Sequence, residues 1–292
     1  MYGKVIFEAL TVESNLPNNH VLCVAADLTG NVWCGPLNGG LVRINDRQLT
    51  FFESHIKEKE PSTNSFFNIA PVGKDLLLGL AGAGVSRFSN GRFIFNLQEN
   101  KVNVNNILIL SDQEYWTASS AGLIHVCGDH KTYYTVADGL PDDYVNTLVC
   151  DGQGRIWCPT SLGLSVFDGE QFVNYTVENG LPNNTCTDIA IDKYGAIWVG
   201  TENGLCRISE KNGQLGFKIY TTNDGLSSNS ILLVHADQSE RLWVGYLGGL
   251  NTIDLKTNSI ANYTDADGFR ALDSYLGAAA TDTYGNVWFG TV

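Results

Sequence analysis

The chain has 292 residues, of which 43% are hydrophobic and 11% aromatic, enough for one large β domain or two smaller domains with a sizeable core. Lys and Arg total 18 against 31 Asp and Glu, and the resulting net charge of −13 disfavours nucleic acid and anionic membrane surfaces as partners. No apolar run approaches the roughly 18–20 residues of a membrane helix. The opening residues MYGKVIFEAL lack a signal-peptide pattern, which leaves open a cytoplasmic protein or a removed signal.

Phrases centred on tryptophan recur along the chain and form its main organising feature. Aligned copies begin with GNVWCGPLNGGLVRI at 30–44 and include GRIWCPTSLGLSVF at 154–167 and GAIWVGTENGLCRI at 195–208. All six tryptophans of the chain fall in one alignment column, which reads Trp33, Leu77, Trp116, Trp157, Trp198, Trp243 and Trp288. Subtraction of these numbers gives spacings between 39 and 45 residues. A period of this length, built from short β-prone runs, is typical of four-stranded propeller blades.

We therefore predict a single all-β domain over 1–292, a seven-bladed β-propeller with four-stranded antiparallel blades. Taken in chain order, the predicted blades cover approximately 20–54, 65–99, 104–137, 145–177, 186–222, 230–265, and 273–292 together with 4–12. Blades two and three are degenerate, since blade two lacks both the Asp-x-x-Gly turn and the tryptophan. The link into blade two, at 53–65, is charged and is predicted to be mobile.

The fifth copy illustrates the expected strand order. It reads as an inner strand at 186–191, an Asp-x-x-Gly turn at 192–195, a tryptophan strand at 196–200, a third strand at 205–209 and an outer strand at 216–221. A crossing loop such as NGLPNN at 179–184 then leads to each inner strand. We expect the apolar residue of each crossing loop to plug the space between blades: Leu16, Leu140, Leu181, Leu226 and Phe269.

The two ends of the chain predict how the ring closes. FEALTVESNLPNN, from Phe7, aligns with FVNYTVENGLPNN, from Phe172, so the N-terminal segment is expected to be an outer strand that pairs into the last blade. Such closure removes exposed sheet edges. The copy at 285–292 stops before its third strand. Either this blade has three strands or the chain is an excerpt of a larger receptor, and we favour the excerpt.

GLPNN, followed by D-x-x-G-x-I-W-V-G-T and x-x-G-L-x-R, resembles the two-component regulator propeller repeat over nearly the whole chain. The resemblance implies a periplasmic sensor domain of a hybrid two-component system like those of Bacteroidetes. It implies oligosaccharides from polysaccharide breakdown as ligands, and other domains of the same receptor and a second copy as partners. It implies no cofactor and no catalysis by this chain, which lacks kinase motifs and makes no membrane contact of its own. The family offers no ligand-binding residues that transfer to this sequence.

Residues that recur in every copy are expected to be architectural. The tryptophan column is assigned to the core, and Cys34 and Cys158 replace apolar residues beside it, so we expect small buried thiols rather than a disulfide or metal ligands. The Asp-x-x-Gly turns lack the calcium-loop pattern. The column of Arg43, Arg87 and Arg207 is expected to pair one blade with the next.

Functional residues are expected where the repeat is broken on exposed loops around the channel mouth. Tyr144, Tyr246 and Arg270 depart from their columns and are the first candidates. Aromatic faces with carboxylate, amide and guanidinium groups suit sugars. The full candidate ligand-binding set is Tyr144, Tyr246, Arg270, Asp142, Asn183, Asn184, Glu202 and Asn203. Asn18, Asn19, Asn38, Asp143 and Asp273 lie in the same loops.

Two other functions stay open on the sequence alone. A propeller face also suits a protein-interaction or assembly role, and propeller scaffolds also carry enzymes such as carbohydrate-active lyases. Catalysis would need an acid–base constellation, whereas the five histidines are scattered: His20, His55, His125, His130 and His235.

Overall fold

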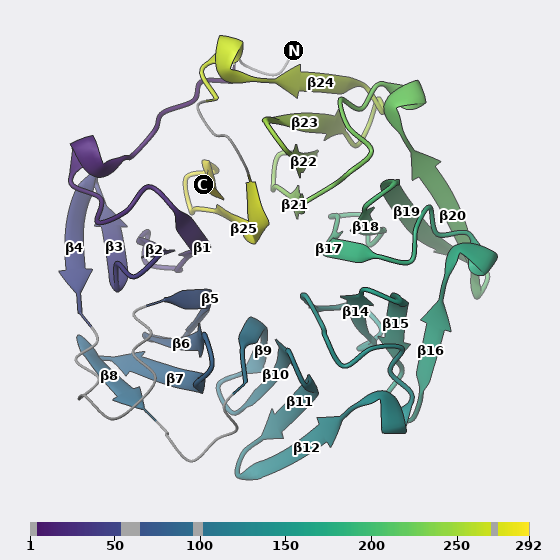
Figure 1. Cartoon of the computed structure of the whole chain (residues 1–292), viewed down its shortest axis with the longest axis horizontal. Helices are drawn as coiled ribbons and strands as arrows, with labels where there is room; N and C mark the ends of the chain where they lie inside the picture. Colours follow the sequence, from purple (N-terminus) through teal and green to yellow (C-terminus); the bar gives the residue numbers. More distant parts are fainter. Residues whose placement is uncertain (1–4, 54–64, 96–101, 270–273, 292) are drawn as a thin grey trace.

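The computed structural model describes residues 5–53, 65–95, 102–269 and 274–291. Within them the chain forms six four-stranded antiparallel sheets and one two-stranded sheet, arranged as a ring around a central axis (Figure 1). We call each four-stranded sheet a blade. Its first strand lies nearest the axis and its fourth lies at the rim (Figure 1).

The first three blades follow each other in chain order. Their strands are β1 (Val21–Ala26), β2 (Val32–Pro36), β3 (Leu41–Asn45), β4 (Gln48–Phe52), β5 (Phe66–Val72), β6 (Asp75–Leu80), β7 (Gly84–Ser89), β8 (Arg92–Phe95), β9 (Val104–Ser111), β10 (Glu114–Ser119), β11 (Gly122–Cys127) and β12 (His130–Tyr134).

Blades four to six and the two-stranded sheet complete the ring. Their strands are β13 (Val149–Cys150), β14 (Ile156–Thr160), β15 (Gly163–Phe167), β16 (Phe172–Tyr175), β17 (Cys186–Ile191), β18 (Ile197–Thr201), β19 (Gly204–Lys211), β20 (Gln214–Tyr220), β21 (Leu233–Ala236), β22 (Arg241–Tyr246), β23 (Gly249–Asp254), β24 (Ile260–Tyr263), β25 (Ser274–Thr281) and β26 (Val287–Thr291).

The prediction of seven blades is wrong, because the described residues form six. The last copy of the repeat supplies only the two strands β25 and β26. Residues 5–11, predicted to close the ring as an outer strand, are not in a strand. The physical reason is that an outer strand pairs with a third strand, and β26 has no third strand beside it among the described residues. The two-stranded sheet nevertheless lies between blade six and blade one (Figure 1).

The tryptophan strands form the core between blades, as predicted. In blade five, β18 is buried along its whole length, and Trp198 is 1% exposed. Trp198 packs with Ile231, Val234 and Leu242 of blade six. Each sheet therefore covers its neighbour, which buries both faces of the second and third strands.

A hydrogen bond that the sequence analysis did not identify fixes five of the six tryptophans, all but Trp116, to their own turns. The aspartate that begins the turn accepts the indole N–H six residues later, in Asp27–Trp33, Asp151–Trp157, Asp192–Trp198, Asp237–Trp243 and Asp282–Trp288, at 2.7–2.8 Å. The other carboxylate oxygen accepts backbone N–H groups of the turn, as Asp192 does from Tyr194 and Ala196. One side chain thus satisfies both the tight turn and a buried donor.

The crossing loops contain short 3-10 helices: η1 (Val12–Ser14), η2 (Val136–Asp138), η3 (Val177–Asn179), η4 (Thr222–Asp224) and η5 (Asp265–Asp267). A threonine caps each helix, and the residue after it adopts a left-handed conformation, with φ of 114° at Gly180. The predicted apolar plugs that follow are all buried, at 3–6% exposed, which confirms their role.

All seven cysteines are free, and Cys34 and Cys158 are buried beside their tryptophans, as predicted. Burial raises the pKa of both thiols to about 12. The hydrogen bonds and ion pairs given for the arginine column among the described residues lie within single blades, although, besides burial, the Arg87 guanidinium also acts on the pKa of Tyr115 in blade three. The Arg207 guanidinium lies 5.4 Å from the ring centre of Trp198, and Arg87 pairs with Asp75 of the same sheet. Over the described ranges, no helix has the length and apolar character needed to span a membrane.

Candidate functional site

The crossing loops and the turns between second and third strands meet at one end of the blades. In blade five the backbone N–H of Glu202, in the second turn, donates to the carbonyl of Thr185 in the crossing loop at 3.2 Å. The N–H of Gly204 donates at 2.7 Å to the carbonyl of Asn229, in the crossing loop that leads to blade six. We call this end of the ring the crossing face. It carries six of the eight residues that the sequence predicts as ligand-binding.

Three of these six residues build the loops themselves. Asp142 accepts the N–H of Tyr144 at 3.0 Å, and Asn183 accepts the N–H of Thr185 at 2.8 Å. Asn184 accepts the N–H of Val177, seven residues earlier, at 2.9 Å. The same bond recurs in other loops, from Val12 to Asn19, from Val136 to Asp143 and from Thr222 to Asn229. These carbonyl and carboxylate oxygens are therefore committed to shaping the crossing loops.

The other three, Tyr144, Glu202 and Asn203, are exposed. The Tyr144 side chain is 46% exposed although it is large and aromatic. Contacts across two loops join its region to that of Glu202: the Ser161 hydroxyl donates to Asp142, and the Thr185 hydroxyl reaches the Ser161 carbonyl at 3.5 Å. We call Tyr144, Glu202 and Asn203 the open set. It combines an aromatic ring, a carboxylate and an amide over neighbouring blades four and five.

The remaining two predicted residues do not extend this set. Tyr246 is the last residue of β22 and is 7% exposed. Its hydroxyl donates to the Asn262 side chain, and a Cβ at Gly249 would stand 2.5 Å from it. Packing in blade six thus explains why Tyr246 departs from its column. Arg270 lies outside the described residues, as does Asp273.

A cavity of about 280 Å³ lies at the inner strands, toward the axis of the ring. Polar side chains from three successive blades line part of it, namely Asn106, Thr147 and Asp188, while Leu233 of blade six and Ala279 of β25 line another part. The register of the strand pairs places Asn106, Asp188 and Leu233 at equivalent positions of their blades. The lining also includes His235 of blade six, so polar and apolar side chains alternate around this part of the channel.

Asp188 is the buried acid of this channel, at 3% exposed. Its carboxylate accepts the N–H of Ile189 at 2.9 Å and the N–H of Val234, in blade six, at 2.8 Å. Burial raises the pKa of Asp188 to about 7, against the opposing effect of these two N–H groups. Asn68 of blade two makes the equivalent contact, accepting the N–H of Ile107 in blade three at 3.2 Å.

The preceding position of the inner strand carries a second contact between blades. Asn105 donates to the carbonyl of Val145, Asn146 to that of Cys186, and Thr187 to that of Ile231, at 2.8–2.9 Å. Sequence analysis missed these residues. Their signal is weak, because polar side chains at the start of an otherwise apolar strand become visible only once all the inner strands are aligned.

Among the described histidines, His125 and His130 share blade three, and His20 and His235 lie elsewhere in the ring. His125 of blade three stacks on Trp116 at 4.3 Å and pairs with Glu114. His235 of blade six contacts the Thr281 hydroxyl at 2.8 Å, and burial lowers its pKa to about 4 despite the nearby Asp237 carboxylate. His235 is therefore neutral at pH 7.

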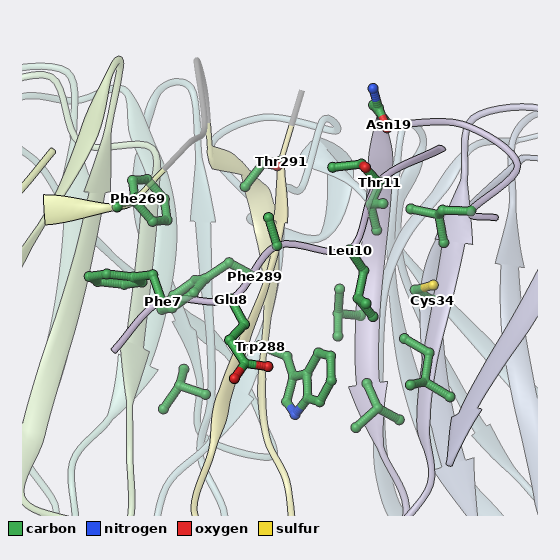
Figure 2. A pocket seen from close by; sticks show the side chains of 18 of the residues that line it. Phe7, Glu8, Leu10, Thr11, Asn19, Cys34, Phe269, Trp288, Phe289 and Thr291 are labelled. Carbon is green, nitrogen blue, oxygen red and sulfur yellow. The ribbon is translucent and has the colours of Figure 1, made fainter. Parts of the chain in front are cut away.

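A second and larger cavity, of about 470 Å³, lies beside β26. Residues 6–11 of the N-terminal segment form one wall, and Val287, Trp288, Phe289 and Thr291 of β26 form the other (Figure 2). Core residues of blade one, including Val24, Val32 and Ile44, form its floor. Asn19 of the first crossing loop lines it, whereas none of the seven described residues of the candidate ligand-binding set does.

Comparison with known proteins agrees with this architecture. Residues 180–203 match the family model described as two component regulator propeller. This match contains the crossing loop and second turn of blade five, and with them Asn183, Asn184, Glu202 and Asn203. A comparison with curated proteins finds no match.

Solved structures give the same result for the fold. The extracellular domain of a hybrid two-component system from B. thetaiotaomicron is similar with a TM-score of 0.86 and 18% identity, over 96% of this chain and 39% of that one. The extracellular domain of a one-component system from the same organism has a TM-score of 0.73 and 19% identity, over 94% and 39%. Virginiamycin B lyase from Staphylococcus aureus, with quinupristin, has a TM-score of 0.72 and 13% identity, over 93% and 92%.

At these identities the likeness establishes the propeller fold. This chain spans 39% of the length of each of the two signalling-system structures. The resemblance predicted from the repeated residues is confirmed by the family model at residues 180–203. The chain is a β-propeller that carries the two-component regulator propeller repeat.

Proposed function

We propose that this propeller is the ligand-binding sensor domain of a two-component signalling receptor and works on the outer side of the membrane. The observation that carries the proposal is the match of residues 180–203 to the regulator propeller repeat. The similar extracellular domains of two signalling systems support it. The chain itself performs no catalysis in this proposal, and its output is a change in free energy on binding, passed to other domains of the receptor.

The proposed ligand is a neutral oligosaccharide. The open set offers the flat face of Tyr144 together with the Glu202 carboxylate and the Asn203 amide, which are the groups that pack against and hydrogen-bond sugar rings. The overall charge of −13 disfavours a polyanionic ligand. The loops beneath the open set are held by backbone bonds to Asp142, Asn183 and Asn184, so the open set sits on a preorganised support.

A thermal-shift screen against a panel of oligosaccharides tests the proposal. A ligand that binds the folded state stabilises it by RT ln(1 + L/Kd), where L is the free ligand concentration, so the melting temperature rises with the logarithm of ligand concentration above Kd. We expect at least one oligosaccharide to do so, and Tyr144→Ala to reduce the shift without changing the melting temperature of the free protein.

Tyr284→Ala is the matched control. Tyr284 is a 78% exposed tyrosine on the Asp-x-x-Gly turn at 282–285, the opposite end of the blades, so its loss should leave the shift unchanged. A panel without any response would contradict the proposal. Release of a new product from a polysaccharide would instead favour a lyase, the activity of one protein with the same fold.

A further inference from the structure

The inner strands carry a contact between blades that does not need a charge. The strand register places Asn68 of blade two at the position that Asp188 holds in blade five. The neutral Asn68 side chain accepts the N–H of Ile107 in blade three at 3.2 Å, and Asp188 accepts the N–H of Val234 in blade six at 2.8 Å. An amide therefore joins two blades as a carboxylate does, so this bond does not explain the negative charge at Asp188.

The Asp188 carboxylate also has unused capacity to accept hydrogen bonds. It is 3% exposed and accepts two backbone N–H groups. Asp237, at 4% exposed, accepts four donors, two of them from Arg241, with which it also forms an ion pair. An ionised carboxylate has about four acceptor sites. The described residues thus leave about half of these sites unfilled at Asp188, which lines the cavity of about 280 Å³.

Two further polar side chains of this cavity have no hydrogen-bond partner among the described residues. Thr147 of blade four is 8% exposed, and Asn106 of blade three is half-buried. Both belong, like Asp188, to complete four-stranded blades. Buried polar groups normally have a partner in the protein or in a bound molecule. A hydroxyl, an amide and a carboxylate are therefore available to a ligand in the cavity.

The protein does not balance the charge of the cavity. Neither lysine nor arginine occurs among the described residues that line it. Within this lining His235 is the other titratable side chain, and burial lowers its pKa to about 4, so it is neutral at pH 7. An ionised Asp188 has no counter-charge in this lining, which favours a cation as ligand and disfavours an anion.

We propose that the cavity binds a small organic molecule that carries a protonated amino group and a hydroxyl group. The ammonium N–H groups donate to the unfilled acceptor sites of Asp188, and the ligand hydroxyl bonds to Thr147 and Asn106. The hydrocarbon part packs against Ile189 and Leu233. This site is separate from the open set and stands independently of the proposed oligosaccharide.

The size and lining of the cavity favour such a molecule over a bare metal ion. Its volume of about 280 Å³ is several times the roughly 30 Å³ that one water occupies in the liquid. The described ranges contain no group of three His, Cys, Asp or Glu side chains that could hold a metal ion. Much of the remaining lining is apolar, including Leu148, Val149 and Ala279, which suits the hydrocarbon part of an organic ligand.

Calorimetric titration of the full chain at pH 8 tests the proposal with two pairs of probes. The first pair is 2-amino-1,3-propanediol and glycerol, and the second is ethanolamine and ethylene glycol. Within each pair a hydroxyl replaces the amino group. We expect at least one amine to bind, and its hydroxyl counterpart to bind at least about 10-fold more weakly, the effect of losing a charge-assisted hydrogen bond.

Three variants assign the binding to the cavity. Asp188→Asn keeps an acceptor for the Val234 N–H and should weaken amine binding by about 10-fold or more, because the charge is lost. Thr147→Val should weaken it by roughly 2- to 10-fold, the effect of one hydrogen bond. Asp129→Asn is the matched control, since it removes the same charge from an exposed turn and should leave the affinity unchanged.

A second titration at pH 5 gives an independent readout. Burial raises the pKa of Asp188 to about 7, so the carboxylate is mostly ionised at pH 8 and mostly protonated at pH 5. His235 stays neutral at both pH values. The amine should bind up to about 100-fold more weakly at pH 5, because only the ionised fraction of the protein binds it.

Several results would overturn the proposal. They are no binding of either amine at millimolar concentration, equal binding of an amine and its hydroxyl counterpart, and full affinity in the Asp188→Asn protein. Binding of calcium or potassium chloride that requires Asp188, without binding of either amine, would also overturn it and assign the cavity to a metal ion.

Discussion

The Asp188 carboxylate in blade five accepts the backbone N–H of Val234 in blade six at 2.8 Å, across the central channel end of the blade interface. This contact joins two inner strands that share no sheet. It also places an ionisable group in a buried position, and the pKa of that group is raised by burial to about 7. Asp188 therefore holds two blades together and also makes the stability of the protein depend on pH.

We expect Asp188 to make stability fall as pH rises from about 4 to about 7. In this window the folded state keeps a proton that the unfolded chain, with an ordinary aspartate pKa of about 3.9, releases. The unfolding free energy therefore decreases with pH in this window. The decrease levels off once the pH exceeds the pKa of Asp188 in the folded state. Asp188→Asn should remove this slope and stabilise the protein above pH 7 by up to about 4 kcal/mol.

Urea unfolding of both proteins between pH 4 and pH 8 measures this effect. The asparagine oxygen can still accept the Val234 N–H, as Asn68 accepts the N–H of Ile107 in blade two. If the difference in unfolding free energy between the two proteins does not change with pH, Asp188 does not titrate in the folded state as described.

The hydrogen bond between Asp192 and Trp198 should contribute more to the free energy of unfolding than the equivalent bond between Asp282 and Trp288 in the two-stranded sheet. Asp192→Ala leaves the buried Trp198 indole N–H without an acceptor and also removes two turn bonds, at an expected cost of roughly 2–4 kcal/mol. Asp282→Ala should cost less, because Trp288 is half-buried and water can replace the carboxylate. Chemical denaturation gives both values, and equal costs would contradict the role assigned to burial.

The plug residue Leu181 should contribute as a core residue although it lies in a loop. It is 3% exposed and packs between blades four and five, so Leu181→Ala should cost roughly 2–4 kcal/mol. Leu162, which is 57% exposed, is the matched control, and its replacement by alanine should change the unfolding free energy by less than about 0.5 kcal/mol. A small effect of Leu181→Ala would show that this side chain contributes little to the packing between blades four and five.

Thiol reactivity should separate the cysteines in the folded state. Cys127 is exposed, whereas Cys34, Cys158, Cys186 and Cys206 are buried, with pKa values that burial raises to about 12. Mass spectrometry after brief treatment with a thiol reagent at pH 8 should find Cys127 modified and these four unmodified. In denaturant all seven should react, and early modification of Cys158 in the native state would mean that blade four opens readily.

The repeat predicted the features that recur in most blades, because the same packing problem is solved in the same way in each of them. The tryptophan core, the plugs and the turns were visible for this reason. The closure of the ring was predicted wrongly. The alignment of the N-terminal segment with the segment from Phe172 indicates where residues 5–11 lie in the ring, but it does not show whether they form hydrogen bonds to a neighbouring strand. Residues 5–11 lie at the rim without a ladder partner, since β26 has no neighbour there to supply the intermediate strand.

The candidate site was predictable only in outline. Departure from a repeat column singled out both Tyr144 and Tyr246, yet the first is exposed and the second is buried against Asn262. A column records that a residue differs, but the side-chain environment decides whether it packs or faces solvent. Asp188 shows the opposite case, because its importance depends on a neighbour 46 residues away in the sequence.

The most direct test of the sensor proposal is hydrogen exchange of the protein with and without an oligosaccharide identified by thermal shift. Binding at the open set predicts slower exchange in the segments at 142–146, 183–187 and 202–206, and unchanged exchange in the turns at 192–195 and 282–285 on the opposite end. Protection confined to those opposite turns, or to the edge of β26, would contradict ligand binding at the crossing face.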